Sequence, residues 1–255
     1  MPRKKKNIFP WISVFVTIGV VSSVTGIIWC AFLWADACGT LVINEMVFKG
    51  AIILNKDQYQ KQLGEMTINN PNQISLLDIQ TVLEEHPYIK AARISHQYPG
   101  IILIELVERE PIAILNREPM VMLDSDGVVL PDIGNLIDFS IPILNNYNPA
   151  PELYPIGYRA LSVKVMESIY WLNLLRSNYH ELYNNLSEMT MENGNEIILI
   201  LADYPTRVEL GDSNSWSKIE ILKKFQQNIE GEKQLSDFTY LDMRYKNQVI
   251  AKERL

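Results

Sequence analysis

Residues 8–35 form an uncharged, largely apolar run that limits what the rest of the chain can be. About 20 apolar residues, each rising about 1.5 Å along a helix, cross a hydrocarbon core of about 30 Å. The run exceeds that length, residues 3–6 before it are all Arg or Lys, and Asp36 is the first charge after it. Because basic residues beside a membrane segment tend to stay in the cytoplasm, the pattern predicts a single-pass type II helix. Residues 1–7 then lie inside the cell and the long C-terminal part lies outside.

A cleaved secretory signal is the main alternative, since it also begins with basic residues and residues 35–37 (Ala-Asp-Ala) resemble a cleavage site. The apolar core of such a signal is normally about 7–15 residues, so the longer run favours an uncleaved anchor. A lipoprotein signal would use Cys38, but Ala35 and Asp36 are poor choices for the positions before a lipidated cysteine.

Outside the apolar run the chain is acidic. It has 23 Lys+Arg and 30 Asp+Glu, and removing the four basic residues at 3–6 leaves 19 against 30, a net charge of −11 for residues 36–255. Such a surface repels phosphate backbones, so we expect no binding to nucleic acid. The two cysteines, Cys30 and Cys38, cannot supply a disulfide framework or a zinc site.

Residues 40–110 predict a small α/β module with one helical layer on a sheet. Ser75 can cap a helix that Pro87 ends, with Asp78 at the spacing of a capping box. Tyr-Pro-Gly at 98–100 has the chemistry of a tight turn. The expected elements are a strand within 40–50, a polar helix over 56–65, a loop over 66–73, the helix from Ser75, and strands over 89–97 and 101–109.

Residues 111–255 predict a larger mixed β domain with flanking helices. Strands are expected over 112–115, 120–123, 128–130, 186–191, 196–201 and 206–210, helices over 162–176 and from Ser215, and two short strands within 238–252 about a turn at 246–247. Residues 131–157 are rich in Pro, Asn and Gly, so we expect a long surface connection there. In the helix that follows Ser162, the spacing of Tyr170 and Trp171 favours the core.

The turn at residues 124–127, Asp-Ser-Asp-Gly, has two possible readings. Asp-Gly between apolar runs is a strong hairpin signal. The same spacing begins a calcium loop, but Asn135 stands where that loop needs an acidic twelfth ligand. We therefore expect a turn and no metal site.

The predicted fold class is thus α/β (α+β) in four parts. These parts are a cytoplasmic tail over 1–7, a transmembrane helix over 8–35, a small β-α-α-β-β module over 40–110 and a β domain over 111–255.

Three stretches of the outer part read as motifs. Residues 86–93 (His-Pro-Tyr-Ile-Lys-Ala-Ala-Arg) end a helix at proline, and residues 108–113 (Glu-Arg-Glu-Pro-Ile-Ala) cross into the second module. Residues 242–251 contain Asp-Met-Arg-Tyr, a turn and then Val-Ile-Ala. Together with the anchor and the β-α-α-β-β order, they resemble the FtsQ/DivIB cell-division family, whose outer part is a POTRA domain followed by a β domain.

This resemblance implies a bitopic scaffold of the divisome, in the cell (inner) membrane at the division septum, that links early and late division proteins during septum assembly. It implies that FtsB (DivIC) and FtsL bind the C-terminal part of the β domain, and that the POTRA-like module, with residues 75–109, serves recruitment. Carried over to this sequence, the partner-binding residues are Arg244, Tyr245, Asn247, Val249, Ile250, Ala251 and Lys252.

The residues themselves offer a mechanism for such binding. A last strand presents a row of unpaired N–H and C=O groups, to which a partner can add a strand. Arg244 and Tyr245 are of types enriched among interface hot spots. The alternative for Tyr245 is a tyrosine packed on its own sheet.

No sequence feature indicates catalysis. His86, His96 and His180 are scattered without metal-ligand spacing, and the chain has no Gly-x-Ser-x-Gly elbow and no phosphate-binding glycine loop. We therefore expect no enzyme, no metal, no cofactor and no small-molecule substrate. A membrane-tethered POTRA adaptor in secretion or outer-membrane assembly is the second hypothesis, and an anchored envelope hydrolase is the third.

Overall fold

The computed structural model describes residues 9–37, 45–69, 75–98, 100–134, 140–211, 215–245 and 248–254. The chain divides into two compact units. One comprises Met1–Leu83 and Ala92–Leu106, and the other comprises Glu84–Ala91 and Val107–Leu255. The chain is mixed α+β, as the sequence predicts.

The apolar run forms one helix, α1 (Phe9–Ala37). Within it, Ser13–Trp34 is long and apolar enough to cross a membrane, and it is the one such segment in the described part of the chain. None of this span is buried against other residues. A side-chain surface that is apolar all round is typical of a helix that contacts lipid.

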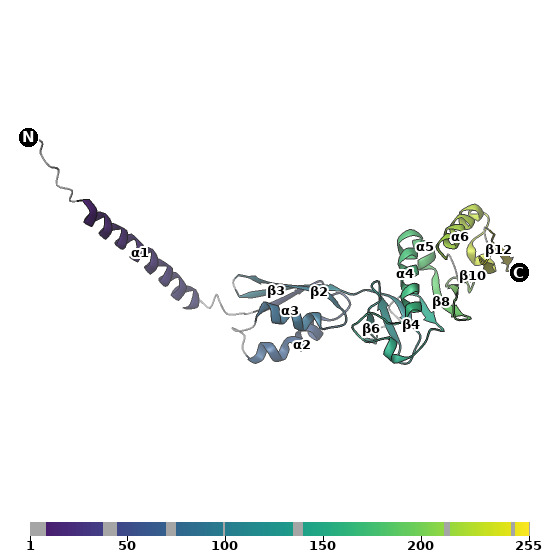
Figure 1. Ribbon diagram of the computed structural model, residues 1–255, viewed down its shortest axis with the longest axis horizontal. Coiled ribbons are helices and arrows are strands. Elements are labelled where there is room, and N and C mark those ends of the chain that lie inside the picture. The colour runs from purple at the N-terminus through teal and green to yellow at the C-terminus, as the bar shows by residue number, and fades with distance from the viewer. Residues whose placement is uncertain are drawn as a thin grey trace, which may run out of the picture. The chain divides into compact units, whose positions relative to one another are not determined.

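The first unit contains a three-stranded sheet in the order β1-β3-β2, with two helices on one side of it (Figure 1). Its elements are β1 (Glu45–Lys49), α2 (Lys56–Asn69), α3 (Leu76–Glu84), β2 (Ile89–Gln97) and β3 (Ile101–Glu108). Strands β1 and β3 are parallel, so the chain must cross over between them, and α2 and α3 lie in that crossover. The predicted β-α-α-β-β order is therefore confirmed.

Apolar side chains join the two helices of this unit to its sheet. Tyr59 on α2 is fully buried and stacks on Phe48 of β1 at 6.5 Å between ring centres. Ile79 and Leu83 are the buried residues of α3, one helical turn apart. The Ser75 hydroxyl accepts a hydrogen bond from the Leu77 N–H at 3.3 Å, which satisfies a backbone donor that the first turn leaves free.

The prediction of a loop over residues 66–73 is wrong for residues 66–69. Helix α2 continues through Asn69, and residues 70–74 lie outside the described part of the chain. The turn-forming residues that predicted the loop cluster at 69–72, and the helix continues past Gly64, its one glycine, to reach them. Residues 40–44 of the predicted first strand also lie outside the described part.

The second unit is built on a nine-stranded sheet in the order β12-β11-β10-β9-β8-β7-β4-β5-β6. The strands are β4 (Pro111–Leu115), β5 (Val121–Asp124), β6 (Val129–Pro131), β7 (Ile143–Asn145), β8 (Leu186–Glu192), β9 (Glu196–Leu201), β10 (Arg207–Gly211), β11 (Phe238–Asp242) and β12 (Ile250–Glu253). Its helices are α4 (Val163–Asn178), α5 (His180–Asn184) and α6 (Ser215–Ile229), with 3-10 turns η2 (Pro151–Leu153) and η3 (Leu235–Asp237).

The core of this unit lies between one face of the sheet and the helices. Val165, Ile169 and Leu172 of α4 are buried in the same cluster as Leu199 and Leu241 of the sheet. Because side chains alternate along a strand, the other face of β10 holds Arg207 and Glu209, whereas β9 places the buried Ile198 on that face. Helix α4 begins as predicted, because the Ser162 hydroxyl accepts a hydrogen bond from the Val165 N–H.

The surface connection expected over residues 131–157 is wrong, because it contains a central strand. Strand β7 lies between β4 and β8 and is parallel to both. Leu144 in it is fully buried, and Tyr147 and Tyr154 join the same core. Three strand residues are too few to show a period, and the surrounding Pro and Asn masked the signal.

The core position expected for Tyr170 is also wrong, since its side chain is 58% exposed. Trp171 packs partly against the core. Neighbouring residues of a helix point about 100° apart, so the broad apolar pattern of α4 could not place both rings inside. The short helix α5 is a further element that the sequence patterns did not predict.

The Asp124 turn is a hairpin turn. The Asp124 carboxylate accepts hydrogen bonds from the backbone N–H groups of Asp126 and Val128 at 2.9 and 2.7 Å. Its other oxygen binds the Arg109 guanidinium at 2.7 Å. Gly127 adopts a φ of +77°, which glycine allows without strain.

Candidate protein-interaction edge

Strand β12 (Ile250–Glu253) forms one end of the nine-stranded sheet. It pairs antiparallel with β11, and its other edge faces no strand in the described part of the chain. All four of its residues are exposed. In an antiparallel strand, alternate residues direct their N–H and C=O groups away from the paired neighbour, so β12 presents free backbone groups along its outer edge.

The register of β12 determines which of its side chains share a face. Ile250 lies opposite Asp242, and Lys252 lies opposite Tyr240. Directly opposed residues point to the same side, and Leu241 between them points into the core. Ile250 and Lys252 therefore lie on the face away from the core, whereas Ala251 lies on the core side.

Arg244 follows β11 on that outer face and binds two carboxylates. Its Nε and Nη2 atoms donate to the two oxygens of Asp242 at 2.9 and 2.7 Å, and its backbone N–H donates to Asp242 Oδ1. Nη2 also lies 3.0 Å from Glu209 Oε2 on β10. The side chain remains 45% exposed, so it belongs both to the hairpin and to the surface.

Charge pairing at Arg244 also affects the ionisation of its neighbours. The hydrogen bonds from Arg244 hold the pKa of Asp242 below its ordinary value of 3.8, and they raise the pKa of Arg244 itself. Glu209 links Arg244 to Arg207, whose Nε donates to Glu209 Oε1 at 3.0 Å. Arg207 also pairs with Glu192 on β8, so the charges form a connected row across the outer face.

Glycine at position 211 makes room for this arrangement. Its φ is +74°, and a Cβ there would lie 3.1 Å from Cγ of Arg244. The sequence motifs did not identify Glu209, Arg207 or Gly211 as part of this site. The alternation in strand β10 does place Arg207 and Glu209 on one face, and that signal was available.

The structure brings most of the predicted partner-binding residues together. Tyr245 is 54% exposed beside Arg244, and Val249 packs partly against the core. Ile250, Ala251 and Lys252 lie in β12. Asn247, which the resemblance also implied, lies outside the described residues.

The histidines do not form a site with one another. His86 accepts a hydrogen bond from the Tyr88 N–H through Nδ1, and its burial lowers its pKa. His180 is exposed and stacks on Tyr183, and His96 is exposed in β2. Among the described residues, no group of three or more His, Cys, Asp or Glu side chains is placed to hold a metal ion.

Comparison with known families agrees with this architecture. The FtsQ-type POTRA domain matches residues 41–109, and the family described as "FtsQ/DivIB, C-terminal related" matches residues 110–252. No match was found among curated proteins.

These features define an apolar N-terminal helix followed by two scaffold domains, the second of which ends in an exposed strand at the end of its sheet. The chain belongs to the FtsQ/DivIB family of cell-division proteins, because that match covers more than half of it. The apolar helix α1 and this membership together indicate a membrane-anchored division protein.

Proposed function

We propose that this protein is a divisome scaffold that binds its partners by strand addition at β12. The single observation that supports this most is the exposure of all four β12 residues at the end of the sheet. A partner strand there would gain backbone hydrogen bonds along its length. Family membership supports FtsB (DivIC) and FtsL as the partners.

Selectivity in this proposal comes from the outer face beside the strand. Ile250 and Lys252 are exposed there, and Tyr245 is exposed directly after Arg244 in the chain. A tyrosine with an apolar ring and a polar tip contributes large contact area at low entropic cost, and Arg offers further donors. Asn247, Val249 and Ala251 complete the proposed surface.

The proposed topology places residues 1–7 in the cytoplasm and the two domains outside the cell membrane, with the protein at the division septum. The basic residues at 3–6 support that orientation. The POTRA domain, including residues 75–109, would serve recruitment, while the β domain binds FtsB (DivIC) and FtsL. The scaffold would link early and late division proteins and catalyse no reaction.

The test is fluorescence microscopy of a fusion at Met1, expressed at low level in dividing host cells, combined with partner pull-down. We expect a mid-cell band for the natural chain and loss of the partner with Tyr245→Glu, because a charge replaces the centre of the contact. The affinity loss should be about 30-fold, the equivalent of about 2 kcal/mol for a hot-spot residue.

Tyr158→Glu is the matched control, since Tyr158 is also exposed, at 72%, but lies next to β6 at the other end of the sheet. It should leave partner binding unchanged. Uniform membrane fluorescence through the cell cycle would contradict the division role and favour the secretion adaptor. Equal partner binding by the natural chain and Tyr245→Glu would remove Tyr245 from the surface.

A further inference from the structure

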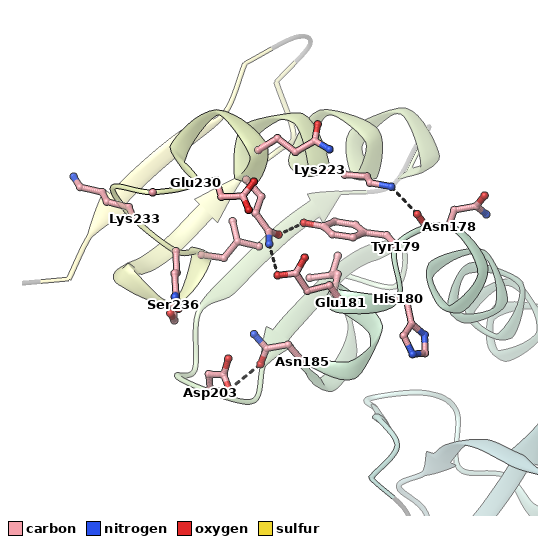
Figure 2. A pocket seen from close by; sticks show the side chains of 16 residues that line it. Asn178, Tyr179, His180, Glu181, Asn185, Asp203, Lys223, Glu230, Lys233 and Ser236 are labelled. Atoms are coloured by element: carbon pink, nitrogen blue, oxygen red, sulfur yellow. Dashed lines mark hydrogen bonds between the residues drawn. The ribbon is translucent and has the colours of Figure 1, made fainter.

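A polar cleft of about 490 Å³ opens in the second unit between the α4–α5 turn and the segment that follows α6 (Figure 2). It lies apart from the outer face described above. Tyr179 and Leu182 form its buried base, while Gln227 and Glu230 at its rim are exposed. A cleft of this volume falls within the size range of ligand sites.

Hydrogen bonds preorganise the base of the cleft. The Tyr179 hydroxyl donates to Gln226 Oε1, and Gln226 Nε2 donates to Glu181 Oε1 at 2.7 Å (Figure 2). Lys223 donates to the Asn178 carbonyl oxygen at 2.8 Å and lies over the Tyr179 ring. These contacts fix the positions of the side chains before any ligand arrives, which lowers the entropic cost of binding.

One wall of the cleft also holds the end of β12. Lys233, which lines the cleft, pairs with Glu253 of β12. The Ser236 carbonyl, in the same wall, accepts a hydrogen bond from Arg254 Nε, and the Asp237 carbonyl accepts one from the Arg254 N–H at 2.8 Å. A polypeptide that runs along β12 therefore reaches this wall where the strand ends.

The lining chemistry matches a peptide better than an ion or a sugar. Five side-chain amides line the cleft, and an amide carries both donors and an acceptor, as a peptide group does, although Gln226 uses both of its amide groups in the base. Two Lys and three Asp or Glu side chains leave a net charge of −1, which gives little attraction to phosphates or strong cations. The Tyr179 ring is buried and cannot serve as the flat platform on which a sugar ring would stack.

We infer that this cleft binds an uncharged, polar stretch of polypeptide that continues from the strand added at β12, in the same partner protein. This inference rests on the proposed function. The partner then contacts the β domain at two places, the strand edge for backbone pairing and the cleft for side-chain amide recognition. Simultaneous binding raises affinity, because the second contact becomes intramolecular.

Hydrogen exchange and variant binding on the full chain in lipid nanodiscs test this inference, with the extracytoplasmic region of the host's FtsB/DivIC-type protein as the probe. We expect slower exchange at β12 and at residues 178–185 and 231–236 together. Gln227→Arg should weaken binding at least 10-fold by filling the cleft. Asn228→Arg, the neighbouring exposed residue of α6 that does not line the cleft, should change affinity less than 2-fold.

Different failures have different meanings. Protection confined to β12, with equal affinity for Gln227→Arg and Asn228→Arg, would overturn the cleft inference and leave the proposed function standing. No protection at β12 would overturn the proposed function and this inference with it. If a disaccharide–peptide fragment of peptidoglycan at 1 mM, added alone, protected the cleft while the partner protein did not, the ligand class would be wrong.

Discussion

The two end strands of the nine-stranded sheet differ in what covers their free edges. At β6 the chain itself covers the edge, because the Val129 N–H donates to the Tyr158 carbonyl at 2.9 Å and the Gly157 N–H donates to the Val129 carbonyl at 2.8 Å. At β12 the described part of the chain provides no such cover. Val129 is fully buried, whereas every residue of β12 is exposed.

Further contacts close the β6 edge. Strand β6 ends at Pro131, which has no N–H to offer, and its carbonyl accepts a hydrogen bond from the buried Tyr88 hydroxyl at 2.8 Å. Proteins commonly protect sheet edges in these ways against unwanted pairing. The open edge is therefore a feature of β12 in particular and not of the sheet as a whole, because the β6 end of the same sheet is covered.

The largest expected effect is on partner binding, from Ala251→Pro in β12. Proline removes an N–H and resists strand geometry, so the partner strand loses its template. We expect affinity to fall about 100-fold or more, equivalent to about 2.7 kcal/mol. Calorimetry on the nanodisc-embedded chain measures this, and Ala251→Ser, which keeps the N–H, is the control. The free energy of unfolding should change little because β12 contributes no residue to the core cluster.

Gly157→Ala, at the closed edge, should lower the free energy of unfolding and leave partner affinity unchanged, the reverse of the result expected for Ala251→Pro. Its φ of +82° lies in the left-handed region, where a side chain costs about 1–2 kcal/mol, although a Cβ would meet only Pro87 at 3.7 Å. Urea unfolding should show that loss, with partner affinity unchanged. A variant that binds the partner more weakly would show that the two edges are coupled.

Tyr88→Phe tests the other contact that closes β6. Removing the hydroxyl leaves the Pro131 carbonyl without this donor, and we expect the free energy of unfolding to fall by about 1 kcal/mol. Thermal and urea unfolding measure the change. Tyr98→Phe, on an exposed tyrosine, is the control and should have no effect.

The smallest effect concerns pH at the open edge. Because the pKa of Asp242 in the folded chain lies below 3.8, its pairing with Arg244 stabilises the hairpin above pH 3.8, and this stabilisation is lost as the pH falls through the folded value. NMR titration of the Asp242 carboxyl measures that pKa, and Arg244→Gln should raise it towards 3.8. An unchanged pKa in that variant would show that Arg244 does not control Asp242.

Local sequence signals were sufficient for most of the fold. Ser75 and Ser162 mark helix starts by their capping chemistry, and the apolar run at 196–201, set between turn residues, predicts β9 with its observed bounds. Such features depend on neighbours a few residues away. For the same reason the β-α-α-β-β order and the final hairpin were predictable.

Features that depend on distant residues were not predictable. Strand β7 has only three residues and becomes a strand because β4 and β8 lie on its two sides. The ion pair between Arg244 and Glu209 joins residues on different elements, and only the parallel pairing of β10 with β11 brings them together. The family resemblance and the residue type made Arg244 a candidate, but the sequence could not reveal which carboxylates hold its side chain.

The three-residue strand β7 also determines how the domain responds to mechanical tension. Consider a force applied between a partner bound at β12 and the POTRA domain, from which the chain continues into β4. Such a force acts in turn on each pair of neighbouring strands between β12 and β4. The pairing of β7 with β4 joins two residue pairs, whereas β8 and β9 share six. We expect single-molecule pulling to separate the sheet first at β7, which would make its pairing with β4 the mechanically weakest part of the domain. Separation that starts between β8 and β9 would contradict this.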